Sequence, residues 1–404
     1  MARELPQDPM IRQLVQMARQ TQLSRRRVLQ GAGAGAATLA LAACAPGGST
    51  SLTPAQDTSD TDKSVTWSNW TLYIDEDEDG NYPTLEAFTE QTGIEVEYRA
   101  DIDDNNTYYG TIKDQLALGQ YPGADTFCLT DWMIGRLVRF GYLQDLDEAN
   151  MPNKKNLQPS LLNPGYDPGR KKTMPWQNGF AGLAWDKEAY PKGLRSVDDL
   201  WAPELKGKIT VLSEWRDTMG ILLLSQGVDI SKEDWGMDEY AKAIELLEEH
   251  VASRHIAGIK GNEYSQDWTT GDAIAGIVWS GDITLMNYEV GYDRWEFVLP
   301  DSGGTLWGDV FGVPMGSARK KNAETLINYY YEPAVAAEVA AWVNFITPVA
   351  GAYEYALENF PEVSDNQLIF PNEQTLSNAY IFRDLDSADD QAFNGEFQRV
   401  KLGA

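Results

Sequence analysis

Short apolar runs alternate with segments of helical periodicity along the chain. In the N-terminal half, this pattern predicts strands at 65–69, 94–98 and 126–129, separated and followed by helices at about 84–91, 108–118 and 132–140. A helix between two strands is typical of the βαβ unit, in which the strands run parallel and the helices cover the faces of the sheet. The pattern therefore predicts an α/β fold.

The alternation resumes after a loop-rich stretch at 151–169. Further strands are predicted at 182–185, 209–212, 275–279 and 310–313, and further helices at about 219–226, 237–250, 323–331 and 334–343. In open α/β sheets, ligands bind beyond the carboxyl ends of the strands. A binding site is therefore expected among the residues that follow each predicted strand.

Five junctions at the ends of predicted strands carry an aromatic residue, most of them beside an acid or a hydroxyl. Four lie where a strand ends, and the fifth leads into the strand at 310–313. The candidate residues are Trp70, Thr71, Tyr73, Thr130, Trp132, Glu214, Asp217, Trp279, Trp307 and Asp309. Carboxylates pair with ammonium groups, while indole and phenol faces attract cations and cover methylene groups. A cleft lined in this way predicts a cationic ligand with apolar length.

The overall charge excludes several other partners. The 404 residues include 61 Asp and Glu against 33 Lys and Arg, which gives a formal net charge of −28. Nucleic-acid binding needs basic side chains that replace phosphate counterions, so no nucleic acid is expected as partner, and anionic ligands are disfavoured for the same reason. Two His and two Cys leave little room for His-based catalysis or His-rich metal sites and cannot form a disulfide framework.

The N-terminus has the features of an export signal with a lipid attachment site. Arg25 and Arg26 lie in a segment typical of a twin-arginine signal, and the apolar run that follows is too short to span a bilayer. The sequence Leu41-Ala42-Ala43-Cys44 resembles the lipobox of bacterial lipoproteins, which implies cleavage before Cys44 and lipid on its thiol. We therefore predict a signal peptide at 1–43, a flexible tether at 44–64, and a lipoprotein anchored on the extracytoplasmic side of the cell membrane.

Several motifs, in their order and spacing, resemble the spermidine/putrescine-binding proteins of ABC importers over about 65–403. They are Asn69-Trp70-Thr71-Leu72-Tyr73, Thr130-x-Trp132, Pro175-Trp176, Asp198-Asp199-Leu200-Trp201, Glu214-x-Arg216-Asp217, Trp279-Ser280-Gly281, Trp307-Gly308-Asp309 and Thr347-Pro348. The resemblance implies a type II periplasmic-binding-protein fold with two lobes, each a mostly parallel sheet flanked by helices, and a hinge between them. It implies one lobe of 65–179 plus 308–353 and a second of 180–307 plus 354–404.

The resemblance also implies roles for single residues. The family's aromatic box falls on Trp70, Tyr73, Trp132, Trp279 and Trp307, its ammonium-binding acids on Glu214, Asp217 and Asp309, and its hydroxyl contacts on Thr71 and Thr130. Phe345 and Phe382 stand where the family has a tyrosine and a glutamine, which leaves the preferred polyamine open. The implied protein is a monomer that needs no cofactor, has no enzymatic activity, and delivers a polyamine to ABC permease subunits in the membrane.

Two other functions remain open on the residues alone. A binding protein for a sugar or a quaternary-ammonium compatible solute would use the same aromatic faces. A neutral sugar, however, does not need three desolvated carboxylates. A glycoside hydrolase would use Glu214 and Asp217 as paired carboxylates, but Arg216 beside them fits ligand clamping equally well.

One local motif suggests a metal. Asp75, Asp77, Asp79 and Glu86 have the spacing of a calcium loop, with glycine directly after Asp79. The motif follows a predicted strand rather than a helix, and Tyr82 and Pro83 are unusual at its eighth and ninth positions. The alternative interpretation is an acidic, solvated turn.

Overall fold

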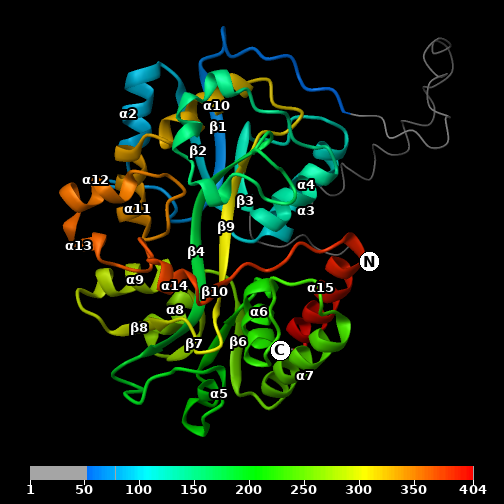
Figure 1. The fold of residues 1–404 in the computed structure, drawn as a ribbon, viewed down its shortest axis with the longest axis vertical. Coiled ribbons are helices and arrows are strands. Elements are labelled where there is room, and N and C mark those ends of the chain that lie inside the picture. Colours follow the sequence, from blue (N-terminus) through cyan, green and yellow to red (C-terminus); the bar gives the residue numbers. More distant parts are fainter. Residues whose placement is uncertain (1–51, 78, 404) are drawn as a thin grey trace, which may run out of the picture. The chain divides into compact units, whose positions relative to one another are not determined.

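The structure, a computed structural model, describes residues 52–77 and 79–403. The predicted export and lipidation residues, Arg25, Arg26 and Cys44, lie outside these ranges. The chain from residue 52 onward forms one compact unit, in which helices surround a single mixed β-sheet (Figure 1). Within the described ranges, no helix combines the length and the apolar character needed to cross a membrane.

Ten strands in the described residues form this sheet. They are β1 (Ser64–Trp70), β2 (Glu95–Ile102), β3 (Thr126–Thr130), β4 (Thr173–Asp186), β5 (Ile209–Leu212), β6 (Ile256–Lys260), β7 (Ala275–Trp279), β8 (Trp295–Val298), β9 (Gly304–Gly312) and β10 (Ala379–Tyr380). Their order across the sheet is β2-β1-β3-β9-β4-β7-β5-β6, with β10 beside β9 and β8 beside β4. Strands β1 to β3 pair in parallel, as do β5 to β7, whereas β4 and β9 are antiparallel to each other.

Helices follow most strands and cover both faces of the sheet. They are α2 (Pro83–Thr92), α3 (Asn105–Ala117), α4 (Asp131–Arg139), α5 (Val197–Leu200), α6 (Trp215–Ser225), α7 (Met237–Ala252), α8 (Tyr264–Thr270), α9 (Ser280–Val290), α10 (Lys320–Tyr330), α11 (Pro333–Val343), α12 (Ala352–Asn359), α13 (Pro361–Ser364), α14 (Glu373–Leu376) and α15 (Ser387–Leu402). Short 3-10 helices occupy Glu148–Asn150, Pro152–Asn156, Pro159–Leu161 and Pro203–Leu205.

Buried side chains divide the unit into two lobes. Lobe 1, in the upper half of Figure 1, has cores that include Trp67, Phe88 and Leu129. Lobe 2, in the lower half, has a core that includes Leu222 and Tyr240. Each lobe has three parallel strands with helices packed against them, so the predicted two-lobed α/β fold is confirmed. The two predicted sheets, however, are continuous with each other.

Strands β4 and β9 join the two lobes. Nearly all of the 14 residues of β4 are buried, which is typical of a strand covered on both faces. Its register with β9 shifts between Pro175 and Asn178, at the passage from lobe 1 to lobe 2. Proline cannot donate a hydrogen bond to the neighbouring strand, so this break in the pairing matches the sequence.

The last crossing between the lobes lies later than predicted. Helix α12 packs against α11, and Ala352 and Ala356 are buried in the core of lobe 1. The chain joins lobe 2 at β10, which pairs with β9, and Leu385 lies in the lobe 2 core. The predicted boundary at 353/354 is therefore wrong. The periodicity at 352–359 indicates a helix but does not tell which lobe covers its apolar side.

The last part of the predicted tether is hydrogen-bonded to lobe 1. The backbone nitrogens of Ala55 and Thr58 donate hydrogen bonds to the carbonyls of Met315 and Ala318, at 2.8 and 2.7 Å. The buried amide of Asn322 donates to the carbonyls of Asp62 and Ser64, at 2.7 Å each. The prediction of a flexible tether up to residue 64 is therefore wrong for its last part. These contacts use backbone atoms, so the shortage of apolar side chains in this segment gave no sign of them.

Candidate functional site

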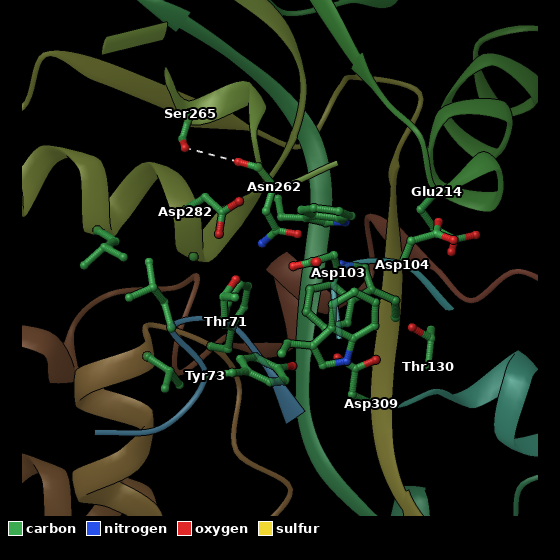
Figure 2. Close-up of a pocket in the computed structure, with 18 of the residues that line it drawn as sticks. Thr71, Tyr73, Asp103, Asp104, Thr130, Glu214, Asn262, Ser265, Asp282 and Asp309 are labelled. Atoms are coloured by element: carbon green, nitrogen blue, oxygen red, sulfur yellow. Dashed lines mark hydrogen bonds between the residues drawn. The ribbon is translucent and has the colours of Figure 1, made fainter. Parts of the chain in front are cut away.

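A cavity of about 240 Å³ lies where the two lobes meet. Nine of the ten predicted binding residues line it: Trp70, Thr71, Tyr73, Thr130, Glu214, Asp217, Trp279, Trp307 and Asp309. Lobe 1 contributes segments that follow β1, β2 and β3, and lobe 2 contributes segments that follow β5, β6 and β7 (Figure 2). The carboxyl ends of the strands thus meet around one space, as expected for an α/β fold.

The walls of this cavity are strongly acidic. Seven carboxylates line it: Asp103, Asp104, Glu214, Asp217, Asp282, Glu289 and Asp309. Among the described residues that line it, none is Lys, Arg or His. Five aromatic side chains, Trp70, Tyr73, Trp279, Trp307 and Phe345, complete the walls. A concave site with one sign of charge focuses the electrostatic potential and concentrates cations.

Glu214 lies at the junction of β5 and α6. One of its carboxylate oxygens accepts a hydrogen bond from the backbone nitrogen of Arg216 at 3.4 Å. The other accepts from the side-chain amide of Asn105 in lobe 1, also at 3.4 Å. Burial raises the pKa of Glu214 to about 8; Arg216 opposes the rise, and Asp217 adds to it. The ionised form of Glu214 therefore lacks strong partners and would gain from a cation in the cavity.

Asp309 lies on β9, directly opposite Thr130 of β3. Burial raises its pKa to about 7, although the hydroxyls of Thr130 and Tyr73 oppose the rise. Asp309 Oδ1 and Tyr73 Oη have no well-aligned hydrogen-bond partner among the described residues. A buried polar atom without a partner costs free energy, so both groups favour a ligand that donates and accepts hydrogen bonds here.

Asp217 has a different role from Glu214 and Asp309. One of its oxygens accepts from the Thr305 hydroxyl at 2.5 Å, and the other accepts from the Trp279 indole nitrogen at 2.9 Å. Burial raises the pKa of Asp217 to about 6, and these two hydrogen bonds limit the rise. Because both oxygens are engaged, Asp217 orients the Trp279 ring at the cavity wall. The same engagement argues against Asp217 as the second carboxylate of a glycoside hydrolase.

Trp132 differs from the other predicted binding residues because it does not line the cavity. The guanidinium carbon of Arg216 lies 4.0 Å from the centroid of its ring. A cation of the protein itself therefore occupies the ring face that was predicted to hold a ligand. Because Trp132 follows β3, the sequence predicts at which edge of the sheet it lies. Which side of helix α4 faces the cavity depends on packing between the lobes, which the local sequence does not specify.

The structure adds site residues that the sequence analysis did not select. Asp282 follows β7 and accepts a hydrogen bond from the Tyr264 hydroxyl at 2.7 Å, and burial raises its pKa to about 6. Asn262 follows β6, and its side-chain oxygen is buried without a partner among the described residues. Asp282 had a signal, because it lies three residues after the predicted strand 275–279. Asn262 had none, because β6 was not predicted.

Two other lobe 1 acids were missed for a related reason. Asp103 and Asp104 follow β2, which extends four residues beyond the predicted 94–98.

Phe345, noted as a departure from the family pattern, lines the cavity. Phe382 instead packs against Trp215 and does not line the cavity.

The segment that resembles a calcium loop forms a turn closed by its own hydrogen bonds. One oxygen of the buried Asp75 carboxylate accepts from the backbone nitrogen of Thr84 at 2.8 Å, and the other accepts from the Thr84 hydroxyl. Asp77 accepts from the backbone nitrogens of Asp79 and Asn81. Across the described ranges, no group of three or more Asp, Glu, His or Cys side chains is arranged to hold a metal ion. The geometry fits the alternative interpretation, an acidic turn.

Comparisons with known proteins agree with this architecture. Residues 84–371 match the family model described as bacterial extracellular solute-binding protein. The spermidine/putrescine-binding periplasmic protein of Salmonella typhimurium is 28% identical over 336 residues, which cover 83% of this chain and 90% of the relative. The putrescine-binding periplasmic protein PotF of Escherichia coli K12 is 25% identical over 359 residues, with coverage of 83% and 90%.

A solved structure shows the same fold. The substrate-binding protein PotD of the spermidine/putrescine ABC transporter of Streptococcus pneumoniae superposes with a TM-score of 0.69 at 24% identity. The superposition covers 84% of this chain and 99% of that one. The resemblance to polyamine-binding proteins of ABC importers is thus confirmed. The family model matches well over half of the length of this chain. The chain therefore belongs to the bacterial extracellular solute-binding proteins, which are binding components of transporters rather than enzymes.

Proposed function

We propose that the protein captures a polyamine such as spermidine or putrescine in the cavity between its lobes and delivers it to an ABC permease. The observation that carries this proposal is the lining of the cavity, with seven carboxylates, five aromatic rings and no basic group among its described residues. Ammonium groups pair with the carboxylates, while the rings hold the charge and cover the methylene groups between amines. Two relatives are named as binding proteins for spermidine/putrescine and for putrescine, which supports the same ligand class.

The arrangement of the carboxylates suits a linear ligand with more than one charge. Figure 2 shows Glu214, Asp309 and Asp282 on different sides of the cavity. Asp309 is buried and the other two are partly buried, and this desolvation raises the pKa of each well above that of a free carboxyl group. Separate amines of one molecule can therefore each meet a carboxylate. A single quaternary ammonium group would leave the other carboxylates unpaired.

Isothermal titration calorimetry with a panel of ligands tests this proposal. The panel comprises putrescine, spermidine, glycine betaine and maltose, each titrated into the purified protein at two salt concentrations. We expect binding heat with the polyamines only, with an affinity that falls as salt screens the charge pairing. Heat with maltose or betaine and none with either polyamine would overturn the proposal in favour of the sugar or compatible-solute alternative.

We also propose that lipid on Cys44 anchors the protein to the outer side of the cell membrane, where it binds its permease as a monomer. The support is the lipobox-like Leu41–Cys44 sequence after the Arg25-Arg26 pair, together with membership in an extracellular family. Expression in a bacterial host with labelled fatty acid should give a labelled protein in the membrane fraction. Cys44→Ala should abolish the label. Equal labelling of both proteins would contradict the assignment.

A further inference from the structure

A cluster of charged and aromatic side chains joins the two lobes beside the cavity. It consists of Trp132 and Arg136 on α4 in lobe 1, Arg216 on α6 in lobe 2, and Asp390 on α15 in lobe 2. We call these four residues the interlobe cluster. In Figure 1, α4 lies in the upper lobe, and α6 and α15 lie below it in the lower lobe.

Asp390 is the centre of the cluster. Its Oδ1 accepts a hydrogen bond from Arg216 Nη2 at 2.6 Å within lobe 2. Its Oδ2 accepts from Arg136 Nη2, which belongs to lobe 1. Although burial opposes the effect, the two guanidinium groups hold the pKa of Asp390 below its usual value. The single carboxylate of Asp390 therefore forms two ion pairs, one within lobe 2 and one across the cleft to lobe 1.

Trp132 makes the second contact between the lobes. The Arg216 guanidinium carbon lies 4.0 Å from the Trp132 ring centroid and 4.3 Å from that of Trp215. Arg216 thus lies over an indole of lobe 1 and an indole of lobe 2. Cation–π contacts are strongest when the cation is desolvated, and Arg216 is only 7% exposed.

The cluster is adjacent to the cavity through Arg216. The backbone nitrogen of Arg216 hydrogen-bonds the carboxylate of Glu214, which also accepts from Asn105 of lobe 1. Any separation of the lobes at this edge would break the Arg136–Asp390 and Trp132–Arg216 contacts and would withdraw Glu214 from Asn105. The same movement would widen the opening of the cavity to solvent.

We propose that the interlobe cluster is a latch that holds the two lobes together and limits the rate at which a bound ligand leaves. Trp132, Arg136 and Asp390 are then positioning residues that act through Arg216 and not on the ligand itself. This inference goes beyond the proposed function, because the latch acts on lobe closure and does not depend on which ligand occupies the cavity.

The variant Arg136→Gln tests the latch most directly. It removes the ion pair across the cleft and leaves the Arg216–Asp390 pair and the contact between Arg216 and Trp132 in place. We expect a larger radius of gyration for the ligand-free protein by small-angle X-ray scattering. We also expect a roughly tenfold faster dissociation of spermidine in stopped-flow tryptophan fluorescence. Arg136→Lys keeps the positive charge and should restore most of both properties.

Arg294→Gln is the matched control. Arg294 pairs with Asp186 at 2.9 Å and lies 4.5 Å from the Trp295 ring centroid, all within lobe 2. Arg136 likewise combines its ion pair with an aromatic contact, because its guanidinium carbon lies 5.2 Å from the Trp132 ring centroid. Its side chain is 21% exposed, against 19% for Arg136. This variant should lose stability without a change in radius of gyration or dissociation rate.

The outcomes separate a latch from an ordinary structural ion pair. If Arg136→Gln and Arg294→Gln change scattering and dissociation equally, or if neither changes them, the latch is wrong. If Arg136→Gln does not fold, Trp132→Leu removes the other contact between the lobes, with both ion pairs intact, and carries the same expectations. The ligand-free scattering decides the question even if spermidine proves not to be the ligand.

Discussion

The carboxylate of Asp309 is buried in the cavity, and one of its oxygens has no well-aligned partner among the described residues. Asp309→Asn keeps the size of the side chain but removes the charge that would pair with an ammonium group. The affinity for spermidine should therefore fall by about 2–5 kcal/mol, the usual cost of removing one member of a buried charge pair. Calorimetry measures this directly. Asp229→Asn, in a lobe 2 turn outside the cavity, should bind as the unmodified protein does.

An unchanged dissociation constant for Asp309→Asn would mean that the ligand does not reach this end of the cavity. Glu214 would then be the main partner of the ligand, because its ionised form also lacks strong partners. The same titration with Glu214→Gln distinguishes the two carboxylates.

At the scale of single residues, the rule that ligands bind beyond strand ends identified most of the side chains that line the cavity. It did not identify the role of each one. Trp70 and Trp279 lie at the cavity because strand ends meet there in any α/β sheet. Trp307 instead lines the cavity from within β9, one of the two strands that join the lobes. Trp132 satisfies the same rule yet stacks on Arg216. Asp217 was predicted to bind an ammonium group, but both of its oxygens hold groups of the protein. Those distinctions depend on partners far away in the sequence.

At the scale of elements, β4 and β9 approach each other closely where they join the lobes. Gly179 of β4 pairs with Trp307 of β9, and a Cβ atom at this position would overlap the rings of Trp307 and Phe345. Gly179→Ala should displace rings that line the cavity and weaken spermidine binding at least tenfold, or about 1.4 kcal/mol. Near-ultraviolet circular dichroism should register the altered Trp307 environment alongside the calorimetric change.

Gly395→Ala is a suitable control for this substitution. Gly395 lies within α15 with no atom near its added Cβ. Alanine is the better helix former, so the control should bind ligand normally and gain roughly 0.5–1 kcal/mol of stability. Normal binding by Gly179→Ala would show that the ring positions tolerate movement at the junction of the lobes.

The bounds of strands were predicted correctly where short apolar runs are bounded by polar residues. Strands β5 and β7 match their predicted bounds residue for residue. Only the last part of β4 was predicted, because Pro175, Gln177 and Asn178 interrupt its apolar pattern while long-range pairing with β9 keeps the strand extended. The attachment of 55–62 to lobe 1 was missed because backbone hydrogen bonds leave no periodic signal.

At the scale of the whole molecule, the net charge of −28 attracts cations without choosing among them. Selection falls to the carboxylates that the fold removes from water. Burial raises the pKa of Glu214 to about 8, of Asp309 to about 7, and of Asp217 and Asp282 to about 6. In the unfolded chain these groups titrate near pH 4. Folding the empty protein therefore takes up protons between about pH 4 and pH 8.

This proton uptake sets the direction of the pH dependence. Where the folded state binds more protons than the unfolded state, stability falls as pH rises. The contribution of these four carboxyl groups is complete below about pH 4 and is lost as pH rises through 6 to 8. A bound polyamine reverses the effect, because its ammonium groups stabilise the ionised carboxylates. Binding should therefore release protons and become tighter as pH rises from 5.5 to 8.

Differential scanning calorimetry of the protein with and without spermidine, at pH 6 and pH 8, tests this linkage. The increase in melting temperature caused by spermidine should be larger at pH 8, where the empty cavity would otherwise hold unpaired negative charge. Glu214→Gln removes the carboxyl group with the highest pKa in the cavity, so it should reduce the difference between the two pH values. An equal increase at both pH values, with no proton release in buffers of different ionisation enthalpy, would show that the buried carboxylates do not titrate with binding.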